Sequence, residues 1–172
     1  MEIQEIRLKD LNPAAFIEEK TRQIAEEVGN GFAISALSGG VDSSVVTVLG
    51  HRSLGKRLIS VFIENGLMRA NEAEHIVAMF KELGVTVEVV DAKRKFFNAL
   101  KGVTDPEEKR EAIAQTFYKR VFGPLVKKSQ ARYLLQGTNY TDVEETVAGI
   151  KRQHNILAQL GIDPQKAFGY KV

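Results

Sequence analysis

The stretch FAISALSGGVDSS, residues 32–44, decides the fold because it has the pattern of a strand, a tight loop and the start of a helix. The apolar run Phe32–Leu37 has the length of a buried strand, and Ser38-Gly39-Gly40 interrupts it. The apolar pattern then resumes over Ser44–Leu49 as a predicted helix. A helix N-terminus that follows a strand in this way presents backbone amides and the positive end of the helix dipole, so this loop is a candidate anion site.

The same alternation of strands and helices continues on both sides of this stretch. Further strands are predicted at Leu58–Ile63, Val85–Val90 and Tyr133–Gln136, and further helices at Asn12–Val28, Asn71–Leu83 and Asp105–Phe122. This alternation predicts an α/β fold, a doubly wound parallel sheet of Rossmann-like type with helices on both faces. Ligands of such sheets bind beyond the carboxyl ends of the strands, so we expect the chemistry after Leu37, Ile63 and Leu135.

The composition limits the domain organisation and the classes of function. The chain has 172 residues, of which 44% are hydrophobic, and we expect one domain over residues 1–172. The net charge of +2 does not indicate a nucleic-acid surface, so a nucleic-acid partner is not expected. The absence of cysteine excludes a disulfide framework, a zinc ribbon and a thiol nucleophile on this chain. We expect a cytoplasmic protein without membrane contact, because no window approaches the length of a membrane span.

The loop itself narrows the type of nucleotide chemistry. It matches neither the G-x-x-x-x-G-K-S/T phosphate loop nor the G-x-G-x-x-G dinucleotide fingerprint. Its hydroxyls, from Ser38, Ser43 and Ser44, and its backbone amides can instead cradle a pyrophosphate. Asp42 supplies the carboxylate that could hold Mg²⁺.

The heptapeptide Ser38–Ser44 resembles the PP-loop of the ATP pyrophosphatases, which cleave ATP between the α and β phosphates. From about Phe32 to Asn155 the chain resembles one family, the ATP pyrophosphatase domain of GMP synthase. Four separated segments carry this resemblance: residues 38–44; residues 62–69 with 71–74; residues 105–107 with 109–110; and residues 136–144 with 150–151 and 154–155.

The resemblance implies a ligase that uses ATP and Mg²⁺. The O2 oxygen of XMP attacks the α phosphorus of ATP, pyrophosphate leaves, and ammonia displaces AMP to give GMP. The residues implied as catalytic are Asp42, Lys151 and His154. The residues implied in binding ATP or pyrophosphate are Ser38, Gly39, Gly40, Val41, Asp42, Ser43, Ser44, Phe62, Ile63, Leu67, Gly137 and Thr138. Asp42 and Asp142 are the implied metal ligands.

The chain departs from the family pattern mainly on the acceptor side. Glu64 stands where an aspartate is usual, Thr141 replaces a proline, Arg152-Gln153 replaces Ser-His, and the Gly-Gly-Leu-Pro stretch after Asn155 is missing. ATP handling is therefore better supported than XMP as the acceptor. Because the chain has no cysteine, ammonia would have to come free or from a separate glutaminase subunit, and we expect a partner subunit of that kind. We expect the glutaminase and the C-terminal dimerisation domain to lie outside this chain, with a homodimer if that C-terminal region exists.

Two other functions and several simpler residue roles stay open. A PP-loop enzyme could transfer sulfur or nitrogen to another acceptor such as tRNA, and a paralogue could bind nucleotide without turnover. Lys109 and Arg110 are as well explained by ion pairs on an exposed helix face. Asp142, Glu144 and Glu145 are as typical of a helix N-terminus as of a metal site. The four phenylalanines at helical spacing, Phe96, Phe97, Phe117 and Phe122, indicate core.

Overall fold

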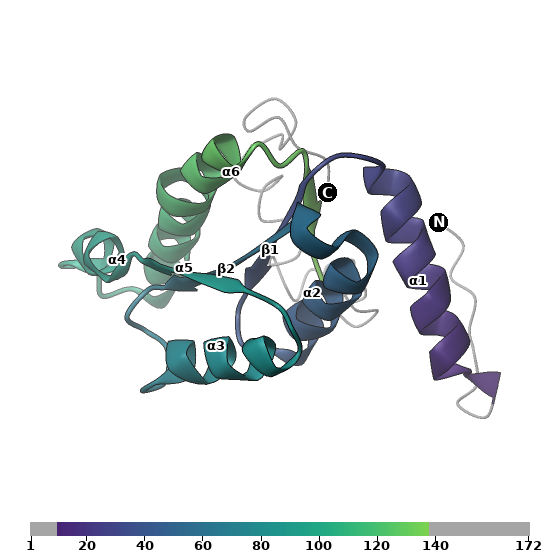
Figure 1. The fold of residues 1–172 in the computed structure, drawn as a ribbon. Helices are drawn as coiled ribbons and strands as arrows, with labels where there is room; N and C mark the ends of the chain where they lie inside the picture. Colours follow the sequence, from purple (N-terminus) through teal and green to yellow (C-terminus); the bar gives the residue numbers. More distant parts are fainter. Residues whose placement is uncertain (1–9, 138–172) are drawn as a thin grey trace.

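The computed structural model of this chain describes residues 10–137 (Figure 1). The first half contains helix α1 (Pro13–Val28), strand β1 (Ala33–Leu37), helix α2 (Val41–Leu54), a 3-10 turn η2 (Gly55–Arg57) and strand β2 (Leu58–Glu64). The second half contains α3 (Glu72–Glu82), β3 (Val87–Asp91), α4 (Lys93–Leu100), α5 (Pro106–Gln115), the π-helical segment η3 (Thr116–Phe122), α6 (Gly123–Ser129) and β4 (Tyr133–Leu135). The α/β fold predicted from the sequence is confirmed.

The four strands form one parallel sheet in the order β3-β2-β1-β4. In the register of this sheet, Ser35 of β1 lies beside Ser60 of β2 on one side and beside Leu135 of β4 on the other. The chain winds outward from β1 to β3 and then returns to the other side of β1, so the strand order reverses between β1 and β4. This switch point is where ligands of doubly wound sheets bind.

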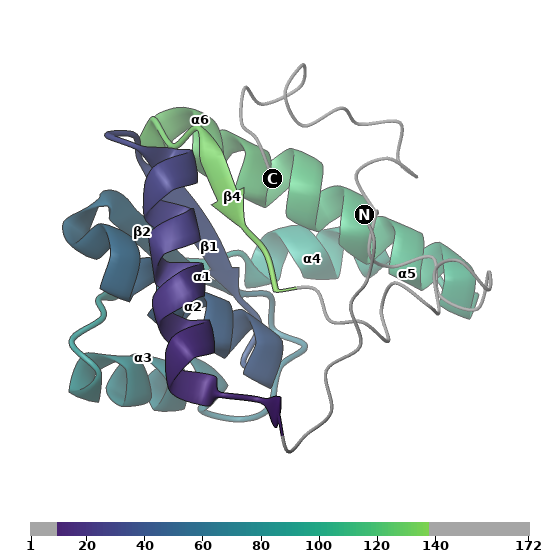
Figure 2. The same ribbon diagram turned by 90° about the vertical axis from the view of Figure 1, so that its right-hand side faces the viewer.

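Helices cover both faces of the sheet, as predicted (Figures 1 and 2). Successive side chains of a strand point to opposite faces, and the two faces carry separate cores. Ile34, Val61 and Leu134 pack against residues of α4, η3 and α6. On the other face, Leu37 and Phe62 pack against α3, and Ala33 and Leu58 pack against Val28 of α1 and Leu54 of α2.

The starts of two helices follow the capping signals of the sequence. Asn12 caps α1 by accepting a hydrogen bond from the Ala15 N–H at 3.2 Å. Asp105 caps α5 by accepting from the N–H groups of Glu107 and Glu108 at 2.9 and 3.0 Å. A proline follows each cap at the first helical position, where its missing N–H costs nothing.

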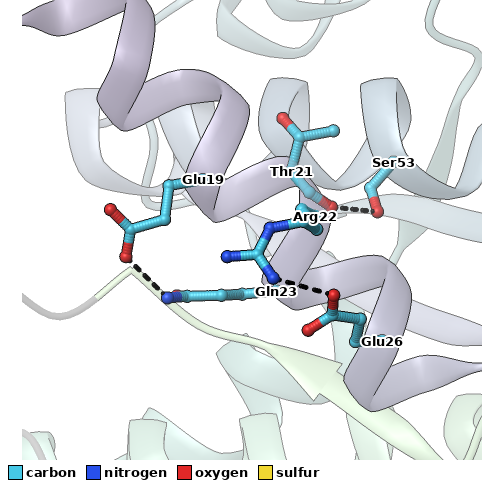
Figure 3. A network of polar contacts seen from close by, with 6 residues as sticks. All are labelled: Glu19, Thr21, Arg22, Gln23, Glu26 and Ser53. Carbon is cyan, nitrogen blue, oxygen red and sulfur yellow. Dashed lines mark hydrogen bonds and ion pairs between the residues drawn. The ribbon is translucent and has the colours of Figure 1, made fainter.

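Helix α1 is fixed to α2 by a side-chain to backbone contact (Figure 3). The Ser53 hydroxyl of α2 donates to the Thr21 carbonyl of α1 at 2.8 Å. Further along α1, Gln23 donates to Glu19, and Arg22 pairs with Glu26. Within residues 10–137, no helix combines the length and the apolar character needed to cross a membrane.

The aromatic residues after β3 divide between the core and the surface. Phe96 and Phe122 are fully buried, and Phe117 stacks on Phe122 with ring centroids 5.7 Å apart. Burial raises the pKa of Tyr118 above its ordinary value. The prediction of a core position is wrong for Phe97, whose side chain is 51% exposed. Its ring instead lies against the loop after β2, where a Cβ on Gly66 would come within 2.5 Å of it.

Candidate functional site

The candidate site lies at the carboxyl end of β1, where the loop of Ser38, Gly39 and Gly40 enters α2. The glycine at position 39 has a φ of +83°, a conformation that side chains with a Cβ rarely adopt. Gly40 is the N-cap residue of α2 and offers no side-chain hydrogen bond to the helix. The first-turn amides of α2 are therefore not capped by a side chain at this position, and with the helix dipole they favour an anion.

Three serine hydroxyls gather around this loop. The Ser38 and Ser43 hydroxyl oxygens lie 3.1 Å apart, and the Ser38 N–H donates to Ser43 Oγ at 3.2 Å. The hydroxyls of Ser43 and Ser44 both donate to the Gly40 carbonyl, at 3.0 and 2.8 Å. The loop therefore holds hydroxyls and amides together at one helix N-terminus, as expected for a pyrophosphate cradle.

A carboxylate from α3 reaches the same loop. A Cβ built on Gly39 would lie 2.8 Å from Glu72 Oε1, so this side chain passes close to the loop backbone. The other oxygen of Glu72 accepts from the Arg69 N–H at 3.1 Å, and the Glu72 side chain is only 16% exposed. The sequence alone assigned this glutamate no role, although it lies in the segment 71–74 that carries the resemblance to GMP synthase.

The end of β4 also approaches the loop closely. A Cβ on Gly137 would lie 2.6 Å from the Asp42 carbonyl oxygen and 2.7 Å from the Asp42 carbonyl carbon. Only a glycine allows two backbones to come so near, because no rotamer change could relieve that contact. The structure thus brings Gly137 beside Asp42, across the switch point between β1 and β4.

The residues at the end of β2 and just after it include both buried and exposed side chains. Phe62 is fully buried and Ile63 is 5% exposed, so both side chains belong to the two cores. Leu67 is 47% exposed. The Glu64 carboxylate, which replaces the usual aspartate, accepts from the Gly66 N–H at 2.8 Å and stabilises the turn.

Other candidates lie apart from the loop or outside the described residues. Arg110 forms an exposed ion pair with Glu107 on α5, which agrees with its simpler interpretation as part of a helix surface. Thr138, Asp142, Lys151 and His154 lie outside residues 10–137. Within the described part of the chain there is no group of three or more His, Cys, Asp or Glu residues that could hold a metal. A metal at Asp42 would thus need ligands from a bound phosphate or from water, which is usual for Mg²⁺.

Comparison with known proteins agrees with this geometry. Residues 14–150 match the family described as NAD synthase. A protein of Archaeoglobus fulgidus, named as one subunit of the glutamine-hydrolyzing GMP synthase, is 52% identical over 141 residues, which cover 82% of this chain and 46% of that protein. The protein of the same name from Sulfurisphaera tokodaii is 45% identical over 161 residues, covering 94% of this chain and 43% of that protein. The chain therefore spans less than half the length of these curated relatives.

A solved structure supports the fold independently. The NH3-dependent NAD synthetase from Campylobacter jejuni, in complex with the nitrate ion, superposes with a TM-score of 0.65 at 15% identity, covering 94% of this chain and 80% of that protein. The resemblance to GMP synthase stated from the sequence is confirmed by the relatives of that name. The chain belongs to the NAD synthase family, whose model matches residues 14–150.

Proposed function

We propose that this chain is the ATP pyrophosphatase part of a GMP synthase. In the proposed reaction the O2 oxygen of XMP attacks the α phosphorus of ATP, and the bond between that phosphorus and the bridging oxygen of pyrophosphate breaks. Ammonia then displaces AMP from the adenylated base, which gives GMP. The observation that carries the proposal is the Ser38–Ser44 loop, with its hydroxyls and with Gly39 in a left-handed backbone conformation at the N-terminus of α2. The relatives named GMP synthase support XMP as the acceptor.

Departure of pyrophosphate requires stabilisation of negative charge. The amides of the loop and of the first turn of α2 would bind the phosphate oxygens, and the hydroxyls of Ser38, Ser43 and Ser44 would exchange their contacts within the loop for contacts with the ligand. The carboxylate of Asp42 is an oxygen ligand of the kind that suits Mg²⁺. Mg²⁺ held by Asp42 would supply further charge neutralisation for the leaving group.

The remaining site residues are assigned by resemblance to the family. Exposed Leu67 would contact the adenosine with its side chain, whereas buried Phe62 and Ile63 would contribute backbone atoms at the end of β2. Gly137 and Thr138 would lie beside the pyrophosphate. Lys151 and His154 would cover both substrates, and Asp142 would be a second metal ligand.

The nitrogen source in this proposal is ammonia delivered by a separate glutaminase subunit. This chain has no cysteine and so provides no thiol nucleophile for glutamine hydrolysis. The two relatives described above are each named as one subunit of a glutamine-hydrolyzing enzyme, which implies a partner subunit. Residues 1–172 would form the single ATP pyrophosphatase domain, and a homodimer would depend on a dimerisation region outside this chain.

The test is the release of pyrophosphate and AMP from Mg·ATP, measured with XMP and an ammonium salt each added or omitted. The proposal predicts release that depends on XMP and formation of GMP only when ammonium is also present. ATP binding without any dependence on XMP would contradict XMP as the acceptor. The same assay with tRNA in place of XMP would then test the alternative acceptor.

Replacement of the loop carboxylate gives a sharper test of the site. We expect Asp42→Asn to lower XMP-dependent pyrophosphate release by about 100-fold or more, because the ligand for Mg²⁺ loses its charge. Thermal unfolding should change little, since Asp42 is exposed. The matched control is Asp10→Asn, an exposed aspartate that precedes α1. Full turnover by Asp42→Asn would remove this residue from the metal site.

A further inference from the structure

Two buried hydroxyl groups connect the sheet to the Ser38–Ser44 loop. Ser35 of β1 and Thr47 of α2 both have fully buried side chains, and their hydroxyl oxygens lie 2.6 Å apart. Thr47 Oγ1 also lies 2.7 Å from the Ser43 carbonyl oxygen, one helical turn earlier. The result is a continuous hydrogen-bonded chain from the sheet to the first turn of α2.

The chemistry of these groups fixes the direction of the chain. A carbonyl oxygen can only accept, so the single hydroxyl proton of Thr47 is donated to the Ser43 carbonyl. Thr47 Oγ1 must then accept from the Ser35 hydroxyl. One end of the chain is anchored firmly, because Ser35 sits in β1 between its paired strands β2 and β4.

The other end reaches the loop through Ser43. The hydroxyl of this serine accepts from the Ser38 N–H and donates to the Gly40 carbonyl. Its backbone carbonyl is the group that Thr47 holds. The backbone carbonyl of Ser43 is thus held by Thr47, and its hydroxyl is bound to Ser38 and Gly40, which would contact pyrophosphate.

We propose that Ser35 and Thr47 are positioning residues that hold the loop in the geometry required for pyrophosphate departure. This inference rests on the function proposed above. The neighbouring strand provides an internal contrast, because Ser60 lies in register with Ser35 and is 4% exposed. Among the described residues its hydroxyl has no hydrogen-bond partner. A buried serine on this face of the sheet therefore does not need such a chain for packing alone.

The test compares variants that differ in a single hydroxyl. Thr47→Val removes the hydroxyl and keeps the shape, whereas Thr47→Ser keeps the hydroxyl and loses a methyl group. Ser35→Ala removes the donor, and Ser60→Ala removes a buried hydroxyl that has no partner. For each variant we would measure kcat and the KM for ATP in XMP-dependent pyrophosphate release, the Kd for Mg·ATP, and the midpoint of thermal unfolding.

We expect Thr47→Val to lower kcat by about tenfold, since small misplacements of catalytic groups carry such costs. Ser35→Ala should also lower kcat. Thr47→Ser and Ser60→Ala should stay within about twofold of the wild type, at a temperature well below all unfolding midpoints. Wild-type kcat and KM in Thr47→Val would overturn the proposal, as would equal impairment of Thr47→Ser and Thr47→Val.

A failure of the proposed function is distinguishable from a failure of this inference. If the wild-type protein binds Mg·ATP but shows no XMP-dependent release, the acceptor is wrong, and the Kd for Mg·ATP becomes the readout. Weaker binding in Thr47→Val than in Thr47→Ser would then support the positioning role. Equal affinity in these two variants would overturn it.

Discussion

At the scale of single residues, the site depends on two glycines, Gly39 and Gly137, at positions where a Cβ would meet other atoms of the protein. Gly39 also has a φ of +83°, and a Cβ on it would lie 2.8 Å from a Glu72 carboxylate oxygen. At Gly137, a Cβ would meet the carbonyl group of Asp42. These constraints explain why two glycines far apart in the sequence belong to the same site.

The substitution Gly39→Ala tests the first constraint. We expect it to destabilise the fold by about 1–2 kcal/mol through the left-handed conformation and to weaken Mg·ATP binding by about tenfold through displacement of the loop. The matched control is Gly84→Ala, because Gly84 has a φ of +76° and open space around its Cβ position. Titration calorimetry and urea unfolding of both variants separate the two effects. Normal ATP affinity in Gly39→Ala would mean that the loop does not approach the phosphates.

The sequence predicts the loop residues of the site but not the residues that support them. Ser38–Ser44 is contiguous and has a recognisable pattern of glycines and hydroxyls. Glu72 approaches this loop, and Thr47 meets Ser35, through contacts that only the fold creates. Ser35 and Thr47 each interrupt an apolar segment of the sequence. The sequence gives no other sign that the two side chains form a hydrogen bond.

At the scale of elements, capping signals predict helix starts well. The residue pairs Asn12-Pro13 and Asp105-Pro106 mark the first residues of α1 and α5, as the structure confirms. Helix α4 was not predicted, because its N-cap residue Ala92 makes no side-chain hydrogen bond and the helix has only eight residues. The helix predicted to end near Phe122 instead continues from η3 into α6, because Phe122 and Gly123 keep helical backbone angles up to Pro124.

Asp105 belongs to the motif that resembles GMP synthase, yet its visible role is structural. We expect Asp105→Ala to lower the free energy of unfolding by about 1 kcal/mol, because two amides of α5 lose their acceptor. Asp105→Asn should retain most of that stability, since the amide oxygen can still accept. Chemical denaturation of both variants measures the difference. Equal stability of Asp105→Ala and the wild type would show that the cap contributes nothing.

At the scale of the whole molecule, the sheet separates residues that hold the fold from residues that can meet a ligand. Phe62 and Leu67 were both expected near the adenosine, but the first is fully buried in the core and the second is 47% exposed. Side-chain alternation along β2 accounts for the burial of Phe62, which packs against Phe80 and Ile76 of α3. The sequence predicted the position of this segment at the strand end but not which of its side chains face outward.

We therefore expect one substitution to lower stability and another to weaken ATP binding. Phe62→Ala should cost about 3–5 kcal/mol of stability, because it leaves a cavity in the core. Leu67→Ala should cost less than about 1 kcal/mol of stability and weaken Mg·ATP binding by about fivefold. Urea unfolding and calorimetric titration measure both quantities. A stable Phe62→Ala variant, or unchanged ATP affinity in Leu67→Ala, would contradict the respective assignment.

The fold places the loop, Asp42 and the end of β4 at one switch point, and the central claim is that an acceptor oxygen attacks the α phosphorus of ATP there. The most direct measurement uses XMP labelled with oxygen-18 at O2, together with Mg·ATP and ammonium, followed by mass spectrometry of the products. We predict that the label appears in AMP and that pyrophosphate carries none. Label in pyrophosphate or orthophosphate, or AMP without label, would contradict adenylation of XMP.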